Sequence, residues 1–260
     1  MSAVAVREEV LQLRLKGLRL PAFLAHYASL AERALTEGWA PIEYLAELVE
    51  VEVAERADRR LKRLLEEAEL PAGKTLASLE LTRYPPPMRA QITELSRGQF
   101  LSEAINVCLI GKPGTGKSHV MAAIARSLVE RGSAVLYTTV AALVERLLAA
   151  KRDLRLAREL KRLDHFECLA LDDIGYVQQD RAEMEVLFTL LAERYERKSV
   201  MITSNLVFSQ WDQIFKDPMT TAAAIDRVVH HAVVLEFTGQ SYRAEQAERR
   251  VAAATKEQRA

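Results

Sequence analysis

Residues 111–118 have the composition and spacing of a phosphate-binding loop. Their sequence, GKPGTGKS, fits the pattern G-x-x-x-x-G-K-[ST] at every fixed position. In this pattern the glycines let consecutive backbone N–H groups turn towards phosphate oxygens, the lysine ammonium reaches the β and γ phosphates, and the serine hydroxyl coordinates Mg²⁺. We therefore predict a site for a nucleotide and Mg²⁺. The predicted binding residues are Gly111, Lys112, Pro113, Gly114, Thr115, Gly116, Lys117, Ser118 and His119.

The sequence on either side of the loop supports this prediction. Residues 106–110, NVCLI, are typical of a buried strand, and Val120, Ile124 and Leu128 recur after the loop at the spacing of a helix. A strand, a loop and a helix in this order form the setting that the pattern requires. The context therefore favours a functional loop over an accidental match.

Two neighbouring carboxylates end a second apolar run. Residues 168–173, CLALDD, predict a strand that ends at Asp172 and Asp173. A carboxylate at the carboxyl end of a parallel strand would lie beside the phosphate loop and could hold Mg²⁺, usually through water, which is the role expected for Asp172. Asp173 would then polarise the water that attacks the phosphate. The alternative is that the paired aspartates cap a turn or a helix.

Two further polar positions could complete a hydrolytic site. Asn205 follows the apolar run 199–204, and its amide could orient the lytic water, although Ser-Asn at a strand end is also common in turns and N-caps. Arg227 lies on a helix predicted over residues 222–231 and could reach the nucleotide of a neighbouring subunit. A surface salt bridge with Asp226 is the alternative for this arginine.

The elements that must position these residues alternate between strands and helices. Five apolar runs are separated by helical segments of about ten residues or more, which is typical of a parallel sheet covered by helices on both faces. We therefore predict an α/β fold. Cys108 and Cys168 lie in two of these runs without metal-ligand spacing, which indicates buried free thiols. The predicted strands are residues 106–110, 134–139, 167–172, 199–204 and 232–237.

The chain before residue 104 has a different character. Residues 1–72 show helical periodicity throughout and predict a small all-α domain that binds DNA or a partner, or mediates dimerisation. Residues 73–103 predict a linker, because three consecutive prolines at 85–87 fix an extended spacer before a short amphipathic helix around Ile92. Residues 104–260 form the predicted α/β domain.

Charge is balanced over the whole chain but segregated locally. The 36 basic and 36 acidic residues give no global preference for nucleic acid, so any such contact must come from local patches. Residues 140–163 predict a helical segment with a basic stripe, suited to contacts with phosphates without base readout. A solvated helix face is the alternative, both here and for a second basic cluster near residue 60. The candidate DNA-contacting residues are Lys151, Arg155, Arg158, Arg162, Arg59, Arg60 and Arg63.

No part of the sequence predicts contact with a membrane. The chain contains no run of the roughly 18 apolar residues that a membrane-spanning helix needs. Near the N-terminus, Arg7, Glu8 and Glu9 interrupt the apolar core that a signal peptide would have. We therefore expect a cytoplasmic protein.

Together these motifs resemble those of the AAA+ ATPases of the DnaA, DnaC and IstB clade. The basic helix after the second strand is similar to the initiator-type insertion of that clade. The matching motifs are GKPGTGKS at 111–118, LDD at 171–173, TSN at 203–205 and IDR at 225–227. The segments that are similar to IstB are LKGLRLP at 15–21, KTL at 74–76 and LEFTGQSYR at 235–243.

The resemblance implies a three-layer AAA+ phosphate-loop core with a five-stranded parallel sheet and with ATP as the nucleotide. It also implies a function, that of a bacterial insertion-sequence helper ATPase. Such proteins form homo-oligomers on duplex DNA with nucleotide at the subunit interfaces, deform the DNA, and recruit and regulate a separate DDE transposase. The residues to which the resemblance assigns the roles given above are Lys117, Ser118, Asp172, Asp173, Asn205 and Arg227.

The chain departs from the family pattern at two points, and two other functions are compatible with the same phosphate loop. Many of these ATPases have glutamate where this chain has Asp173. Only 17 residues follow Arg243, so we expect the C-terminal helical lid to be absent or vestigial. A DnaC-like loader of a replicative helicase would share the ATPase core, but the N-terminal segment 15–21 favours the transposition helper. A small-molecule phosphotransferase would use the same loop, but the chain lacks an arginine-rich substrate lid.

Overall fold

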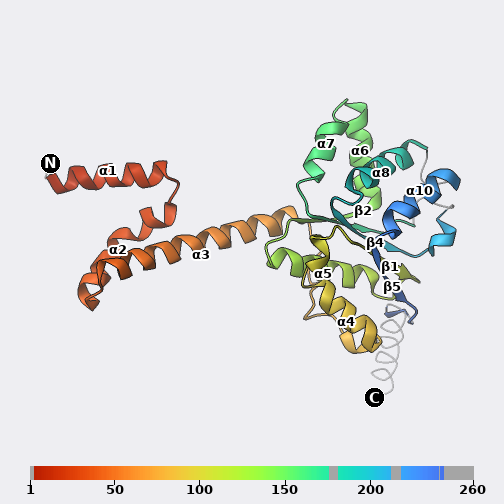
Figure 1. Cartoon of the computed structure of the whole chain (residues 1–260), viewed down its shortest axis with the longest axis horizontal. Coiled ribbons are helices and arrows are strands. Elements are labelled where there is room, and N and C mark those ends of the chain that lie inside the picture. Colours follow the sequence, from red (N-terminus) through yellow and green to blue (C-terminus); the bar gives the residue numbers. More distant parts are fainter. Residues whose placement is uncertain (1–2, 176–180, 212–217, 240, 243–260) are drawn as a thin grey trace, which may run out of the picture. The chain divides into compact units, whose positions relative to one another are not determined.

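The computed structural model describes residues 3–175, 181–211, 218–239, 241 and 242, and the chain divides into two compact units (Figure 1). The first unit is Met1–Arg63 and the second is Leu64–Ala260. The division falls within a helix, earlier in the chain than residue 72, where we expected the helical domain to end. The expectation about a C-terminal lid concerns residues after 242, which lie outside the described residues.

The first unit is entirely helical in its described part. It consists of α1 (Ala3–Gly17), α2 (Pro21–Glu37) and the first part of α3 (Pro41–Glu67). A proline is well suited to the first position of α2, because its fixed φ matches the helix and it has no N–H that would lack a partner there. Gly38 ends the same helix with φ of 70°, and its N–H donates to the carbonyl of Ala34.

Glu52 joins α2 to α3 within this unit. Its side chain is buried, and its carboxylate accepts hydrogen bonds from the backbone N–H groups of Ala22 (2.8 Å) and Phe23 (3.4 Å) and from Arg56 Nε (2.6 Å). Burial alone would raise the pKa of Glu52, but the hydrogen bonds from Arg56 and from the start of α2 outweigh it and lower the pKa. A carboxylate of α3 therefore caps the amino end of α2.

The second unit is built around one parallel sheet of five strands. These are β1 (Asn106–Gly111), β2 (Val135–Thr139), β3 (Cys168–Asp172), β4 (Ser199–Ser204) and β5 (Ala232–Phe237). Their order across the sheet is β2-β3-β4-β1-β5, and every neighbouring pair is parallel. All five predicted strands are confirmed. The carboxyl ends of β1, β3 and β4 lie side by side, because the order places β4 between the other two.

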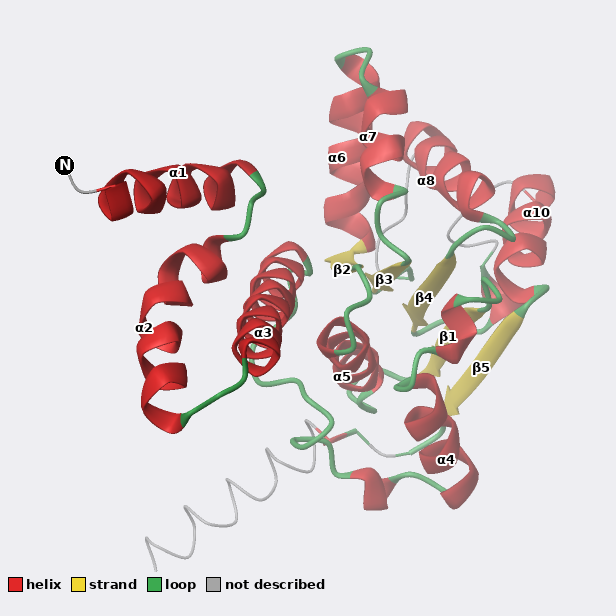
Figure 2. Cartoon of the chain, turned by 60° about the vertical axis from the view of Figure 1, so that its left-hand side comes forward, coloured by secondary structure: helices red, strands yellow, loops and turns green. Residues whose placement is uncertain are grey.

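Helices cover both faces of this sheet (Figures 1 and 2). Helix α5 (Lys117–Glu130) lies on one face and contacts β1, β2, β3 and β4. Helices α6 (Val140–Arg152), α8 (Arg181–Arg194) and α10 (Pro218–Val229) lie on the other face, where α8 packs between α6 and α10. The three-layer α/β prediction is confirmed. Among the described residues, no helix combines the length and apolar character needed to cross a membrane.

The segment that we expected to be a linker is folded onto the second unit. Helix α4 (Pro86–Leu95) packs against α5 and buries Ile92 and Leu95, and short 3-10 helices precede it at Leu81–Arg83 and follow it at Gln99–Leu101. The helix expected around Ile92 is therefore present. The apolar face of α4 explains why the segment packs rather than extends.

The basic segment after β2 differs from the prediction. Residues 140–163 form two helices, α6 and α7 (Leu156–Leu163), which pack against each other as a hairpin. The break comes at Leu154, whose φ of 56° is left-handed. Lys151 therefore lies on α6, while Arg158 and Arg162 lie on α7, and the expected single basic stripe is wrong.

Arg194, the last residue of α8, is buried and has no ion pair with a carboxylate among the residues that the structure describes. Only 2% of its surface is exposed, and its guanidinium donates to four backbone carbonyl oxygens at 3.0–3.3 Å. Burial lowers its pKa to about 10, so the group is still charged at neutral pH. The arginine thus ties the end of α7 to the starts of two strands. The acceptors are the carbonyls of Leu163, Phe166, Glu167 and Ser199.

We predict that Arg194→Met destabilises the second unit by at least about 3 kcal/mol, because several buried carbonyls lose their donor at about 1–3 kcal/mol each. Urea unfolding would measure the loss. The matched control is Arg197→Met, three residues along the chain, whose exposed ion pair with Asp164 is worth less than about 1 kcal/mol. Equal unfolding midpoints for the two variants would contradict the structural role of Arg194.

Candidate nucleotide-binding site

The phosphate loop connects the carboxyl end of β1 to the amino end of α5. Gly111 and Gly116 have φ of 151° and 98°, values that a residue with a side chain rarely adopts. A Cβ atom on Gly111 would lie 2.3 Å from the carbonyl oxygen of Phe237, and one on Gly116 would lie 2.5 Å from the hydroxyl of Tyr84. Both the conformation and the close packing therefore require glycine at these two positions.

Lys117 begins α5 and is nearly buried, with 6% of its surface exposed. Its ammonium donates to the carbonyl oxygens of Gly111 (2.6 Å) and Lys112 (2.9 Å), and the hydroxyl of Thr115 also donates to Lys112 (2.8 Å). The cation is thus held inside the loop, next to the amino end of a helix. Both features favour an anion such as a phosphate.

Asp172 ends β3 and accepts hydrogen bonds from three hydroxyl groups. Ser118 Oγ donates to its Oδ1 at 2.8 Å, Thr203 Oγ1 donates to the same oxygen, and Tyr137 OH donates to Oδ2 at 2.6 Å. Burial and the hydrogen bond to Asp172 raise the pKa of Tyr137, so the phenol is protonated and donates. The two residues expected to hold Mg²⁺, Ser118 and Asp172, are therefore in contact.

Asp173 lies next to Asp172 but lines a different space. Its φ of 63° is left-handed, a conformation that aspartate tolerates better than most residues, and its N–H donates to Thr203 Oγ1 at 2.9 Å. Asp173 lines the cavity in front of the phosphate loop. The turn after β3 therefore lets Asp172 contact Ser118 of the loop while Asp173 lines the cavity. Thr203 contacts both aspartates, a role that we did not predict for this member of the motif at 203–205.

The cavity in front of the loop has a volume of about 670 Å³ and lies entirely within the second unit. Residues 113–119 line one side of it. Two further segments that we did not expect at the site also line it, residues 74–88 and residues 236–242 at the end of β5 and after it. There Tyr84 packs edge-on against Phe237, with 5.7 Å between ring centroids, and Arg83 lies 4.8 Å over the ring of Tyr242. This aromatic wall is suited to a planar base.

His119 joins the loop helix to the expected linker. Its Nε2 lies 3.1 Å from the hydroxyl of Ser78, and both residues line the cavity. Ser78 in turn donates to the carbonyl of Gly73 and accepts from the N–H of Thr75. Burial lowers the pKa of His119, so the imidazole is neutral at pH 7. We expected His119 to bind nucleotide, and it lines the cavity in front of the loop.

Asn205 follows β4 but is not among the residues that line the cavity. Its side chain packs on the backbone of Gly175, where a Cβ atom would lie 2.1 Å from Asn205 Oδ1. This oxygen is buried and has no hydrogen-bond partner within the described residues. The amide oxygen of Asn205 is therefore available to accept a hydrogen bond. It lies one residue after the end of β4, the strand that carries Thr203.

Arg227 lies at the opposite edge of the sheet from the loop. Its carbonyl accepts a hydrogen bond from Nδ2 of Asn106, the first residue of β1, at 3.3 Å. The strand places about 17 Å between that end and Gly111, at about 3.3 Å per residue. The guanidinium stacks 4.4 Å over the ring of Phe188, and its buried Nη1 has no hydrogen-bond partner in the described part of the chain. The fold thus separates Arg227 from its own phosphate loop.

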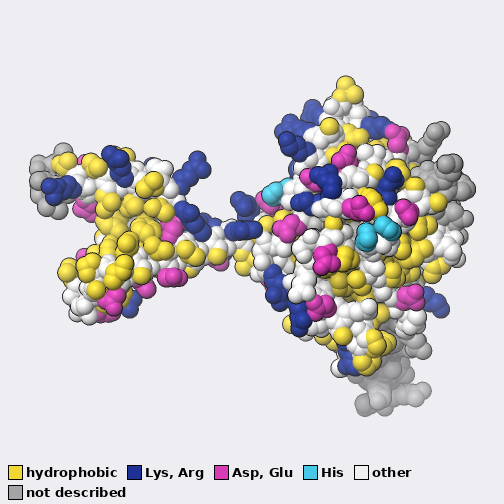
Figure 3. Space-filling view, viewed as in Figure 1, with side chains coloured by type: hydrophobic (Ala, Val, Ile, Leu, Met, Phe, Trp, Pro, Cys, Tyr) yellow, Lys and Arg dark blue, Asp and Glu magenta, His cyan; other side chains and the backbone are white. Residues whose placement is uncertain are grey.

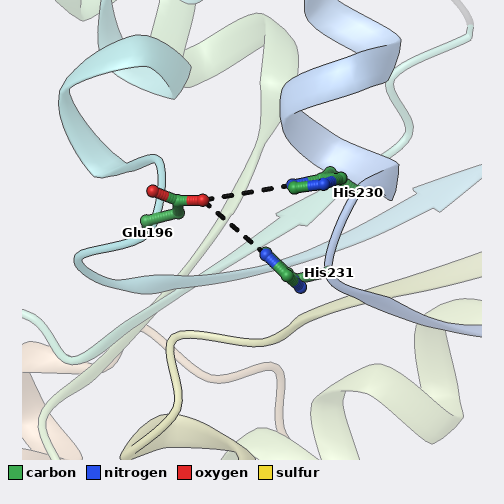
Figure 4. A group of neighbouring side chains, drawn as sticks. All are labelled: Glu196, His230 and His231. Atoms are coloured by element: carbon green, nitrogen blue, oxygen red, sulfur yellow. Dashed lines mark ion pairs between the residues drawn. The ribbon is translucent and has the colours of Figure 1, made fainter.

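A second polar cluster lies close to Arg227 in the chain. Glu196 Oε1 lies 4.0 Å from His230 Nδ1 and 3.6 Å from His231 Nε2, and Figure 4 shows this one carboxylate oxygen facing both rings. All three side chains are exposed, and Tyr195 OH also lies 2.9 Å from His230 Nδ1. Two imidazoles and a carboxylate are donors that suit Zn²⁺. The ion pairs also tie the turn after α8 to the turn before β5.

The basic residues expected at DNA fall in both units. In the second unit Lys151 pairs with Glu185 (2.9 Å) and Arg162 with Glu159 (3.2 Å), whereas Arg155 and Arg158 are exposed and, among the described residues, have no ion pair. The first unit holds the other set, Arg59, Arg60 and Arg63, of which Arg59 pairs with Glu52 and Glu55.

Comparison with known proteins identifies close relatives by sequence. A family model described as "IstB-like ATP binding protein" matches residues 13–250. An insertion sequence ATP-binding protein of Sinorhizobium fredii is 44% identical over 239 residues, which cover 92% of this chain and 80% of that protein. The ATP-binding protein of insertion sequence IS21 from Pseudomonas aeruginosa is 35% identical over 233 residues, which cover 90% of this chain and 88% of that protein.

Solved structures show the same fold at lower identity. AMPPCP-bound DnaA from Aquifex aeolicus aligns with a TM-score of 0.54 and 17% identity, over 65% of this chain and 51% of the DnaA chain. The DnaC helicase loader aligns with a TM-score of 0.51 and 16% identity, over 61% of this chain and 96% of that chain. The prediction of a AAA+ phosphate-loop core is confirmed.

We predict that Thr203→Val raises the Mg²⁺ concentration needed for half-maximal ATP hydrolysis by about 10–100-fold, because it removes the hydroxyl that donates to the Asp172 carboxylate and accepts from the Asp173 backbone N–H. A Mg²⁺ titration at saturating ATP would measure the change. The matched control is Ser204→Ala on the same strand, since the buried hydroxyl of Ser204 bonds to the backbone of Leu206 and not to the site. An unchanged Mg²⁺ requirement in the Thr203 variant would remove this residue from the site.

Proposed function

We propose that this chain, which belongs to the family of IstB-like ATP-binding proteins, is an ATP-hydrolysing helper of DNA transposition. It would assemble on duplex DNA when ATP is bound, deform the DNA, and recruit and regulate a DDE transposase. The observation that carries the ATPase part is the contact between Ser118 and Asp172 at the mouth of the phosphate loop. The insertion-sequence relatives support the rest.

The residues around the loop fit a Mg²⁺-bound nucleoside triphosphate. A serine hydroxyl and a carboxylate oxygen 2.8 Å apart are the hard oxygen donors that Mg²⁺ takes, and Ser118 and Asp172 would hold it. When bound, the ion would neutralise charge that develops on the phosphates. Lys117 would turn from the loop carbonyls to the β and γ phosphates. Asp173, which lines the cavity, would accept a hydrogen bond from the attacking water and orient it.

The base would lie against the aromatic wall of the cavity. Tyr84 and Phe237 line the cavity and provide apolar ring surface there, and the guanidinium of Arg83 lies over the ring of Tyr242. Aromatic rings bind planar bases by stacking. We infer that residues 74–88, rather than acting as a spacer, bind the adenine of ATP.

We also propose that the hydrolytic site is completed by a second subunit. Arg227 is too far from its own phosphate loop to contact that nucleotide, and its stacked guanidinium has a buried nitrogen without a hydrogen-bond partner among the described residues. A guanidinium that reaches the phosphates of a neighbouring subunit would stabilise the transition state. This arrangement supports a homo-oligomer with ATP at its interfaces.

The proposed DNA contact is through phosphates. Arg155 and Arg158 are exposed at the outer part of the α6–α7 hairpin, and Figure 3 shows Lys and Arg side chains gathered over α7. Arginines without base-edge contacts bind duplexes with little sequence preference. The basic hairpin therefore supports a protein that accepts many target sequences.

We predict that duplex DNA binds only in the presence of a slowly hydrolysed ATP analogue and that the affinity falls steeply with salt, with a log–log slope of about −0.9 per phosphate contact. Fluorescence anisotropy on several unrelated duplexes, with imaging of the same complexes, would measure affinity and assembly. Lys117→Ala is the control that cannot bind nucleotide. A complex that is insensitive to salt and selective for one sequence would contradict the proposal.

We predict that Arg227→Ala binds ATP but hydrolyses it about 10³–10⁵-fold more slowly, because the transition state loses its arginine. Mixing this variant with Lys117→Ala should restore activity, since some interfaces then pair an intact loop with an intact arginine. Random pairing in an equal mixture makes about one quarter of the interfaces productive. The absence of rescue at every mixing ratio would rule out a role of Arg227 in a neighbouring site.

A further inference from the structure

The outer end of the α6–α7 hairpin carries a leucine that is almost fully exposed. Leu154 has 95% of its surface exposed, more than any other exposed large apolar residue in the described part of the chain. It lies in the turn between α6 and α7. An apolar side chain in such a position gains nothing from the core.

The backbone of this turn is well defined by hydrogen bonds. The N–H of Leu154 donates to the carbonyl of Lys151 (3.1 Å), and the N–H of Arg155 donates to the carbonyl of Ala150 (2.7 Å). Leu154 has φ of 56°, a conformation in which glycine or asparagine costs less than leucine. The turn therefore holds an unfavourable residue in a fixed position, which points to a role for its side chain.

The hairpin that carries this leucine has a net positive charge. Between residues 151 and 162 the hairpin carries six basic and two acidic side chains, and Figure 3 shows hydrophobic atoms at the outer end of the hairpin with Lys and Arg side chains beside them. A protein-docking surface would present several apolar residues together. One apolar side chain among cations instead matches the proteins that insert a wedge between base pairs. The basic residues are Lys151, Arg152, Arg155, Arg158, Lys161 and Arg162, and the acidic ones are Asp153 and Glu159.

We propose that Leu154 inserts between adjacent base pairs of duplex DNA while the arginines on either side bind phosphates. The inference rests on the proposed DNA binding and adds the site at which the duplex is distorted. Insertion separates two stacked base pairs and kinks the helix axis, and pyrimidine–purine steps are the easiest to open. The wedge would make the deformation, whereas the arginines would provide the affinity.

The test compares Leu154→Asn with Leu154→Met in the full-length protein with a slowly hydrolysed ATP analogue. Asparagine tolerates the left-handed backbone, so it removes the apolar wedge without straining the turn, and methionine keeps an apolar side chain of similar length. Permanganate reactivity of thymines reports unstacking, and energy transfer between dyes on the two ends of a duplex reports bending. Anisotropy over a range of salt concentrations reports affinity.

We expect the asparagine variant to bind DNA with an unchanged salt slope but to lose the enhanced thymine reactivity and the bend, and the methionine variant to retain both. If the asparagine variant unstacks and bends DNA as much as the original protein does, the proposal that Leu154 acts as a wedge is wrong. The proposal of DNA binding would not be affected by that result. If sedimentation shows that the asparagine variant fails to assemble in the absence of DNA, the wedge proposal is also wrong, and Leu154 instead contacts another protein subunit. If the unmodified protein binds no duplex, both the wedge and the proposed function are wrong.

Discussion

The site depends on the hydrogen bonds that the Asp172 carboxylate accepts. It sits at the end of β3 and is held by hydroxyls from α5, β2 and β4, namely those of Ser118, Tyr137 and Thr203. A buried carboxylate is unfavourable unless its oxygens are hydrogen-bonded, so these three elements must meet at this point for the charge to be tolerated. The phosphate loop, the aspartates and the polar end of β4 are therefore positioned by one shared group.

The parallel sheet has two functionally different edges, one formed by the carboxyl ends of its strands and one by their amino ends. Strands that all run in the same direction bring their carboxyl ends together, and the loop and both aspartates lie there. The opposite edge carries the end of α10 and Arg227, together with the cluster of Glu196, His230 and His231. The proposed homo-oligomer would need this separation, because a phosphate loop on one edge and an arginine on the other can meet in a head-to-tail assembly but not in a two-fold dimer.

The sequence predicted what depends on local pattern and missed what depends on distant contacts. Buried strands are continuous apolar runs, and the phosphate loop is fixed by its glycines, so both could be located from the sequence. The aromatic wall could not, because Tyr84 and Phe237 are far apart in the chain and meet only after folding. The break at Leu154 was missed because leucine is a strong helix former and rarely adopts a left-handed conformation. The buried position of Arg194 could not be predicted either, because its four acceptors are backbone carbonyls of other parts of the chain.

The internal hydrogen bonds of Lys117 have a thermodynamic consequence for nucleotide affinity. The ammonium donates hydrogen bonds to the carbonyls of Gly111 and Lys112. Binding is therefore an exchange of one set of partners for another, and its free energy is the difference between the two rather than the full strength of the lysine–phosphate contact. The affinity for a phosphate group therefore depends on how strongly the two loop carbonyls hold the ammonium, as well as on the lysine–phosphate contact itself.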